Sequence, residues 1–97
     1  SLTTASRATL RKQANFLRKN KNLNVTIEGH ADERGTREYN LALGERRANA
    51  ARDYLMTYGI SGKRISVISY GKEKPVNPKS SAVAWSQNRR SVTVKVN

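Results

Sequence analysis

The densest group of chemically active side chains lies between residues 28 and 47. Glu28, His30 and Asp32 alternate along one segment, and Arg47 follows fifteen residues after Asp32. If the intervening loop folds back, the Asp32 carboxylate and the Arg47 guanidinium come together at the entrance of one site. An ammonium group would bind the Asp32 carboxylate, and a ligand carboxylate would take the bidentate fork of Arg47. The pair suits a zwitterionic ligand, or else it is a plain salt bridge that ties the loop to the next helix.

The same residues offer weaker patterns for metal binding and catalysis. His30 and Asp32 form an H-x-D pair, but the chain has one histidine and no cysteine, and one histidine rarely makes a zinc site. The adjacent carboxylates of Asp32 and Glu33 seldom converge on one bond, and no G-x-S-x-G elbow is present. We therefore predict no catalytic residues, no metal and no cofactor. His30 is expected to be a hydrogen-bonded group near the rim of the site.

Hydrophobic periodicity predicts the elements that must position these groups. Leu10, Ala14 and Leu17 recur at helical spacing within 4–20, and a second helix over 38–58 is capped by Thr36 and ended by Gly59. Alternating side chains predict strands over 24–30, 65–70 and 91–96, with a short helical turn over 81–87. This order predicts an α/β (α+β) two-layer sandwich in which helices cover one face of the sheet and the other face stays in water.

Composition limits the class of protein and suggests a charged partner. A chain of 97 residues has the length of one domain, so we expect a single domain over 1–97. No apolar run approaches the roughly 20 residues that a membrane-spanning helix needs. The formal net charge of +12 suits an anionic partner, and a basic nucleic-acid-binding module is the alternative function. Against it, the RNA-recognition pattern needs aromatic residues on the middle strands, where this chain offers only Tyr70 near a strand end.

Several motifs in this order resemble one known family. They are TIEGHADERGT at 26–36, EYN at 38–40, LGERRA at 43–48, SYGKEKP at 69–75 and NRR at 88–90. Together they are similar to the OmpA-like peptidoglycan-binding domain, and the resemblance runs from about residue 8 to residue 96. Long motifs in matching order make the resemblance highly specific.

The resemblance implies a mixed-sheet β-α-β-α-β-β domain that holds the stem peptide of peptidoglycan non-covalently. Asp32 and Arg47 fall on the family's principal ligand positions, which contact the amine and the carboxylate of meso-diaminopimelate. A binding pair is therefore favoured over the plain salt bridge. The other positions that the resemblance assigns to this pocket are Asn40, Leu43, Gly29, His30 and Ala31.

The resemblance also implies a cellular setting. Members of the family tether the outer membrane of Gram-negative bacteria to the wall from the periplasm, some through a lipid anchor, and some pair with TolB of the Tol system. No nucleic-acid partner is expected on this basis. The family's first strand is missing because this chain begins at the first helix, so we expect an N-terminally truncated domain. The family places that strand beside 91–96, which would leave this edge exposed.

Overall fold

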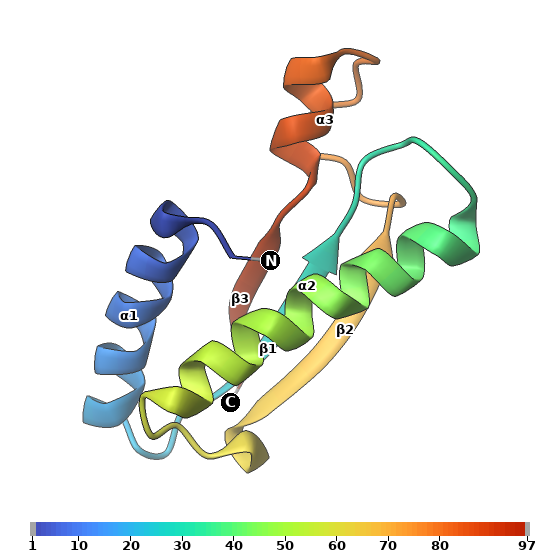
Figure 1. The fold of residues 1–97 in the computed structure, drawn as a ribbon. Helices are drawn as coiled ribbons and strands as arrows, with labels where there is room; N and C mark the ends of the chain where they lie inside the picture. Colours follow the sequence, from blue (N-terminus) through green and yellow to red (C-terminus); the bar gives the residue numbers. More distant parts are fainter. Residues whose placement is uncertain (1, 97) are drawn as a thin grey trace.

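The computed structural model describes residues 2–96 and has its two long helices on one side of a three-stranded sheet, with a short third α-helix beyond the end of the sheet (Figure 1). The sheet order is β2-β1-β3, with β1 parallel to β2 and antiparallel to β3. This confirms the predicted mixed α/β architecture. In chain order the elements are α1 (Thr4–Lys19), β1 (Asn24–His30), α2 (Arg37–Thr57), η1 (Gly62–Arg64), β2 (Ile65–Gly71), α3 (Ala82–Asn88) and β3 (Ser91–Val96).

One hydrophobic core lies between the two long helices and the sheet. The α1 side chains that recur at helical spacing are all buried in it, as predicted, and they meet apolar side chains of α2, β1 and β2. Burying one such aliphatic side chain is worth about 1.5 to 3 kcal/mol, so this layer holds both helices on the sheet. Its buried members from the named elements are Leu10, Ala14, Leu17, Val25, Ile27, Ala48, Ala51, Leu55 and Ile65.

The ends of α2 follow from two residue types that the sequence already marks. The Thr36 side chain accepts a hydrogen bond from the backbone N–H of Tyr39, as a helix N-cap does. At the other end Gly59 has a φ of 87°, which a residue without a side chain adopts at low cost. The helix therefore starts and stops within one residue of its predicted bounds. No helix within residues 2–96 is both long and apolar enough to cross a membrane.

The uncovered face of the sheet is partly apolar rather than fully polar. Val92, Val94 and Val96 are 37%, 40% and 44% exposed, and they lie on the side away from the helices. This follows from the register, because Val94 pairs with Thr26, whose neighbours Val25 and Ile27 face the core. Within the described residues β3 pairs only with β1, so it forms one edge of the sheet.

A close crossing of backbones brings the start of α2 to the end of β1. A Cβ atom built on Gly29 would lie 1.7 Å from the carbonyl oxygen of Gly44, so only glycine permits this approach. At the same point the register with β2 shifts, since Gly29 pairs with Ser69 and His30 pairs with Gly71. Such a bulge bends a strand and redirects its side chains. The chain that leaves β1 therefore enters its loop directly beside the N-terminal half of α2.

Candidate functional site

A shallow pocket of about 370 Å³ opens beside the loop that joins β1 to α2. Asp32 contributes its main anionic group, and this side chain is buried although the loop around it is exposed. A buried carboxylate at a pocket wall must be paired, because an isolated charge away from water is costly. The lining residues are Asp32, Arg34, Gly35, Tyr39, Asn40, Leu43 and Arg89.

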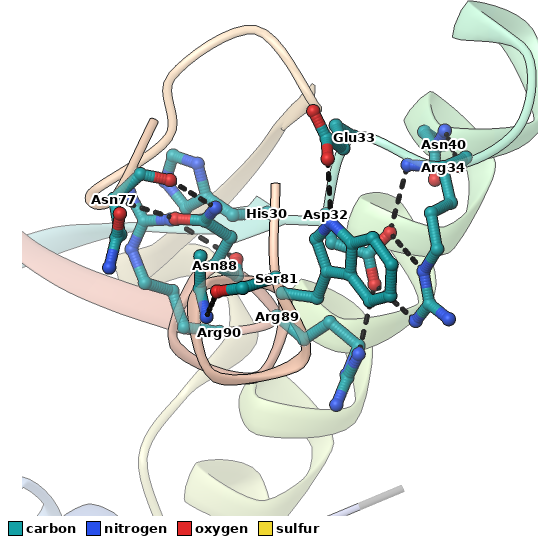
Figure 2. Close-up of polar contacts among 12 residues, drawn as sticks. His30, Asp32, Glu33, Arg34, Asn40, Asn77, Ser81, Asn88, Arg89 and Arg90 are labelled. Atoms are coloured by element: carbon teal, nitrogen blue, oxygen red, sulfur yellow. Dashed lines mark hydrogen bonds and ion pairs between the residues drawn. The ribbon is translucent and has the colours of Figure 1, made fainter. Parts of the chain in front are cut away.

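Two arginines compensate the Asp32 carboxylate (Figure 2). The Arg34 guanidinium donates from Nε to Oδ1 at 3.1 Å and from Nη2 to Oδ2 at 2.8 Å, while its backbone N–H also donates to Oδ1. Arg89 donates from Nη1 to Oδ2 at 2.9 Å. The hydrogen bonds from Arg34 are the largest cause that holds the pKa of Asp32 far below its ordinary value. Asp32 is therefore a firmly ionised carboxylate at neutral pH.

Arg47 lies near this carboxylate without an ion pair to it. Its Nη1 atom donates to the backbone carbonyl of His30 at 2.9 Å, and the side chain is half-buried. Burial is the main cause that lowers the pKa of Arg47, the positive charge of Arg89 lowers it further, and Asp32 opposes both. The plain Asp32 to Arg47 salt bridge is thus wrong as an account of this pair. Arg34 and Arg89 form ion pairs with the Asp32 carboxylate, whereas Arg47 donates a hydrogen bond to the backbone carbonyl of His30.

Asn40 and Leu43 lie in the same pocket lining as Asp32. The Asn40 amide donates from Nδ2 to the backbone carbonyls of Arg34, at 2.6 Å, and of Thr36, at 2.9 Å. Because these bonds use both donor hydrogens, Asn40 holds the loop closed over the start of α2. Leu43 is half-buried and supplies an apolar surface one turn further along the helix.

Comparison with known proteins identifies the family. A family model described as OmpA family matches residues 1–89. The chain belongs to the OmpA family. A peptidoglycan-associated lipoprotein from Rhizobium meliloti is 61% identical over 94 residues, which are 97% of this chain and 53% of the relative. A protein of the same name from Pseudomonas aeruginosa is 56% identical over 66 residues, which are 68% of this chain and 39% of that protein.

Solved structures agree with this assignment of the fold. The crystal structure of the peptidoglycan-associated lipoprotein from Burkholderia pseudomallei superimposes with a TM-score of 0.94 at 40% identity, covering 99% of this chain and 81% of that one. The C-terminal domain of Helicobacter pylori MotB shares the fold at a TM-score of 0.89 and 20% identity, covering 100% of this chain and 76% of that one. This OmpA-family chain spans about half the length of the curated relatives it matches.

The end of β1 holds three further residues that the family resemblance assigned to this pocket. None of them contributes to the pocket lining. Gly29 lies against the backbone of Gly44, and Ala31 is buried. His30 does not lie at the rim as expected, because the residue is 1% exposed and its ring stacks on Tyr70 with ring centroids 5.5 Å apart. These residues shape the OmpA-family site through the backbone, most directly through the His30 carbonyl that Arg47 contacts.

Buried His30 makes the stability of this OmpA-family domain sensitive to mild acid. Burial lowers the pKa of His30 below its ordinary value of 6.5, Arg90 and Lys74 lower it further, and the hydrogen bond to Glu28 opposes them. The unfolded chain therefore takes up the proton first, and free energy of unfolding is lost as pH falls below 6.5. Urea unfolding at about pH 7.5 and about pH 5.5 should show a smaller loss in His30→Asn than in wild type. Equal losses of free energy of unfolding in wild type and His30→Asn would contradict the assignment of this pH sensitivity to His30.

The sequence did not predict the contacts that α3 and the residue after it make with the loop of the OmpA-family site. The Trp85 indole donates to Glu33 at 2.7 Å, and the Arg34 guanidinium lies over the Trp85 ring, 4.3 Å from its centroid. Arg89, which the sequence analysis names only as part of the NRR motif, contacts Asp32. Arg34 could have been found from its spacing, since an Asp side chain often bonds the backbone two residues on. Arg89 lies 57 residues from Asp32, and no local signal connects them.

Proposed function

We propose that this domain binds peptidoglycan non-covalently through the meso-diaminopimelate of its stem peptide. The observation that carries the proposal is the ionised Asp32 carboxylate, set in a pocket among arginines in a member of the OmpA family. Relatives that are 55% to 61% identical over 97% of this chain are named peptidoglycan-associated lipoproteins. The name of these relatives states a ligand class, peptidoglycan, and this pocket suits the stem peptide of that ligand.

The side chain of diaminopimelate ends in an ammonium group and a carboxylate on one carbon atom. Asp32 offers an anion for the ammonium, and Arg47 offers a cation for the carboxylate from the neighbouring part of α2. Asn40 shapes the loop between these two charges, and Leu43 provides an apolar contact for the methylene groups of the ligand. Two opposite charges at a fixed separation orient such a ligand in one way only.

Ligand binding requires Asp32 to exchange one of its present partners. The Arg34 side chain is 54% exposed and that of Arg89 is 37% exposed, so Arg34 is the partner of Asp32 that water solvates more easily. Ion pairs with exposed arginines are typically worth about 1 kcal/mol or less, although a bidentate pair is stronger. We infer that the ligand ammonium replaces Arg34 on the carboxylate and that Arg34 remains over Trp85.

The setting of the whole protein is part of the same proposal. We infer a periplasmic protein of a Gram-negative bacterium that anchors the outer membrane to the wall. A lipid anchor and docking to a TolB-like protein of the Tol system belong to this proposal. The described domain needs only binding chemistry for this role, and we propose no enzymatic step.

Isothermal titration with a muropeptide that contains diaminopimelate tests the function. We expect saturable binding, and we expect whole sacculi to sediment the protein. A titration without heat, together with protein that stays in the supernatant, would overturn the proposal. If such a protein still retained a TolB-like partner in a pull-down, a pure protein-docking role would replace it.

Net charge favours one second candidate function, the binding of nucleic acid. Tyr70 stacks on His30 and carries the Lys74 ammonium 3.8 Å from its centroid, and the Arg34 guanidinium lies over Trp85. Tyr39 is exposed in the pocket lining, but one ring is a small platform for stacking successive bases. Nucleic-acid affinity should therefore be mainly electrostatic and should fall steeply with salt. An electrophoretic shift that persists at moderate salt, without muropeptide binding, would favour this alternative.

A further inference from the structure

Exposed cations gather at the end of the molecule where α1 finishes and β2 begins. The last turn of α1 carries Arg18 and Lys19, the following loop carries Lys21, and η1 carries Lys63. We call these four residues the basic end. All four are exposed, and among the described residues none of them forms an ion pair with an acid. Their positive charge is therefore open to a partner.

The segments of chain that build the basic end lack acidic residues. The first 27 residues contain no Asp or Glu, and neither does the stretch from 54 to 72. A surface made from such segments carries charge of one sign. Summed like charges attract an anion over distances up to a Debye length, about 8 Å at physiological salt. The net charge of the chain is thus concentrated where few carboxylates can compensate it.

Arg64 fixes the end of α1 against η1. Its guanidinium donates to the backbone carbonyls of Leu17, Asn20 and Leu23 at distances between 2.7 and 3.1 Å. These bonds also compensate carbonyls at the C-terminal end of the helix, whose partial negative charge would otherwise repel an anion. The backbone that carries the basic end is therefore held in one arrangement.

The basic end and the pocket that contains Asp32 lie at opposite ends of the sheet (Figure 1). β1 and β2 are parallel, so both begin at the basic end and both finish beside the pocket. β1 starts at Asn24, three residues after Lys21, and ends at His30, two residues before Asp32. A strand of 7 residues, at about 3.3 Å per residue, separates the two ends by roughly 20 Å. A partner at the basic end would therefore leave the pocket free.

The chemistry of the basic end suits a surface of phosphate groups. Most of its members are lysines, which bind phosphate as point charges and need no planar fork geometry. Lys19 and Lys21 line one open depression of about 460 Å³, whose other lining residues are uncharged. Phe16 is exposed one turn before Lys19, but one ring is a small platform for stacking successive bases. These features favour a phosphate-bearing surface over a nucleic acid.

We propose that the basic end docks on the headgroup phosphates of an anionic phospholipid bilayer. A bilayer presents many phosphates in one plane, so it can engage cations from α1, the loop and η1 together. The domain would rest on the membrane through this end and hold its peptide ligand at the other. The membrane contact uses none of the pocket residues, so it can be tested apart from the proposed function.

Co-sedimentation with vesicles tests the membrane contact. The chain should bind phosphatidylcholine vesicles that contain phosphatidylglycerol, should not bind vesicles of phosphatidylcholine alone, and should be released as salt rises. One lysine near an anionic membrane raises affinity about 5-fold. The double variant Lys19→Gln with Lys21→Gln should therefore bind the anionic vesicles about 25-fold more weakly, and its affinity for a muropeptide should equal that of wild type.

Arg46→Gln with Lys79→Gln is the matched control. It removes the same charge from two exposed positions outside the basic end, so vesicle affinity should change by less than about 2-fold. Equal losses in the two double variants would show that net charge alone attracts the chain, and they would overturn the proposal.

Absence of binding to anionic vesicles would also overturn the membrane contact. If the chain instead bound a single-stranded oligonucleotide through Lys19 and Lys21, a nucleic-acid surface would replace it. A chain that binds anionic vesicles but no muropeptide would remove the proposed function and leave the membrane contact standing.

Discussion

Asp32→Ala is expected to reduce affinity for a diaminopimelate muropeptide by at least about 30-fold, a cost of roughly 2 to 5 kcal/mol. The substitution removes the anion that receives the ligand ammonium. It also leaves Arg34 and Arg89 without their shared carboxylate. Arg47→Ala is expected to cost a similar amount, since the ligand carboxylate would then lose the cation that we propose for it. Isothermal titration of each variant measures the effect.

A matched control separates this loss from a general effect of charge. Asp53→Ala removes an exposed carboxylate from the same helix as Arg47, and it should leave affinity unchanged. Asp32→Asn keeps the shape of the side chain and should bind nearly as poorly as Asp32→Ala. Unchanged affinity in both Asp32→Ala and Arg47→Ala would remove the charge-pair mechanism.

The ionisation of Asp32 determines the pH at which these titrations should be made. The folded state holds the pKa of this carboxyl far below its ordinary value, so ionised Asp32 stabilises the fold at neutral pH. That contribution is complete above the ordinary value of 3.8 and is lost only as pH falls below it. Binding measured near neutral pH therefore compares a fully charged Asp32 with its neutral replacements.

Gly29→Ala is expected to cause the largest loss of folding stability of the variants considered, about 3 kcal/mol or more. Its new Cβ atom would overlap the carbonyl oxygen of Gly44, 1.7 Å away, and backbone cannot rotate aside as a side chain can. Either β1 or α2 must shift, and overpacked interiors typically lose about 1 to 3 kcal/mol even where side chains can adjust. Urea unfolding followed by circular dichroism measures the change in free energy of unfolding.

Gly59 supplies the contrast for this prediction. A Cβ atom built there meets no other atom within 4 Å, so Gly59→Ala costs only the strain of a left-handed backbone, about 1 to 2 kcal/mol. If Gly29→Ala were as stable as Gly59→Ala, the close crossing of β1 and α2 would be wrong. Loss of ligand binding in Gly29→Ala would reflect the displaced helix, so it would not make Gly29 a ligand contact.

The regular elements could be predicted from the sequence because their signals are local. Helical spacing of Leu10, Ala14 and Leu17 marks the buried stripe of α1, and alternation marks each of the three strands. The face of the sheet to which the β3 valines point could be found only from the register between β3 and β1. Valines at alternate positions would ordinarily be assigned to the core, but pairing of Val94 with Thr26 turns them to the uncovered face.

The candidate site could be predicted only in part. Placing Asp32 beside the first turns of α2 follows from a short loop between a strand and a capped helix, and family resemblance adds Asn40 and Leu43. The surroundings of His30 could not be foreseen, since Tyr70 reaches it from the neighbouring strand. Whether a histidine near a strand end is buried depends on which side chains the sheet register places over it.

By itself the sequence determined the order of helices and strands, the helix caps and the family, because each is encoded over a few neighbouring residues or in motifs read in order. Tertiary structure alone decided which charges meet. Arg34, Arg47 and Arg89 were all possible partners of Asp32, and only the pairing of β3 with β1 brought Arg89, two residues before β3, to its carboxylate. Partners of a charged group depend on distances across the fold, and spacing along the chain carries little information about them.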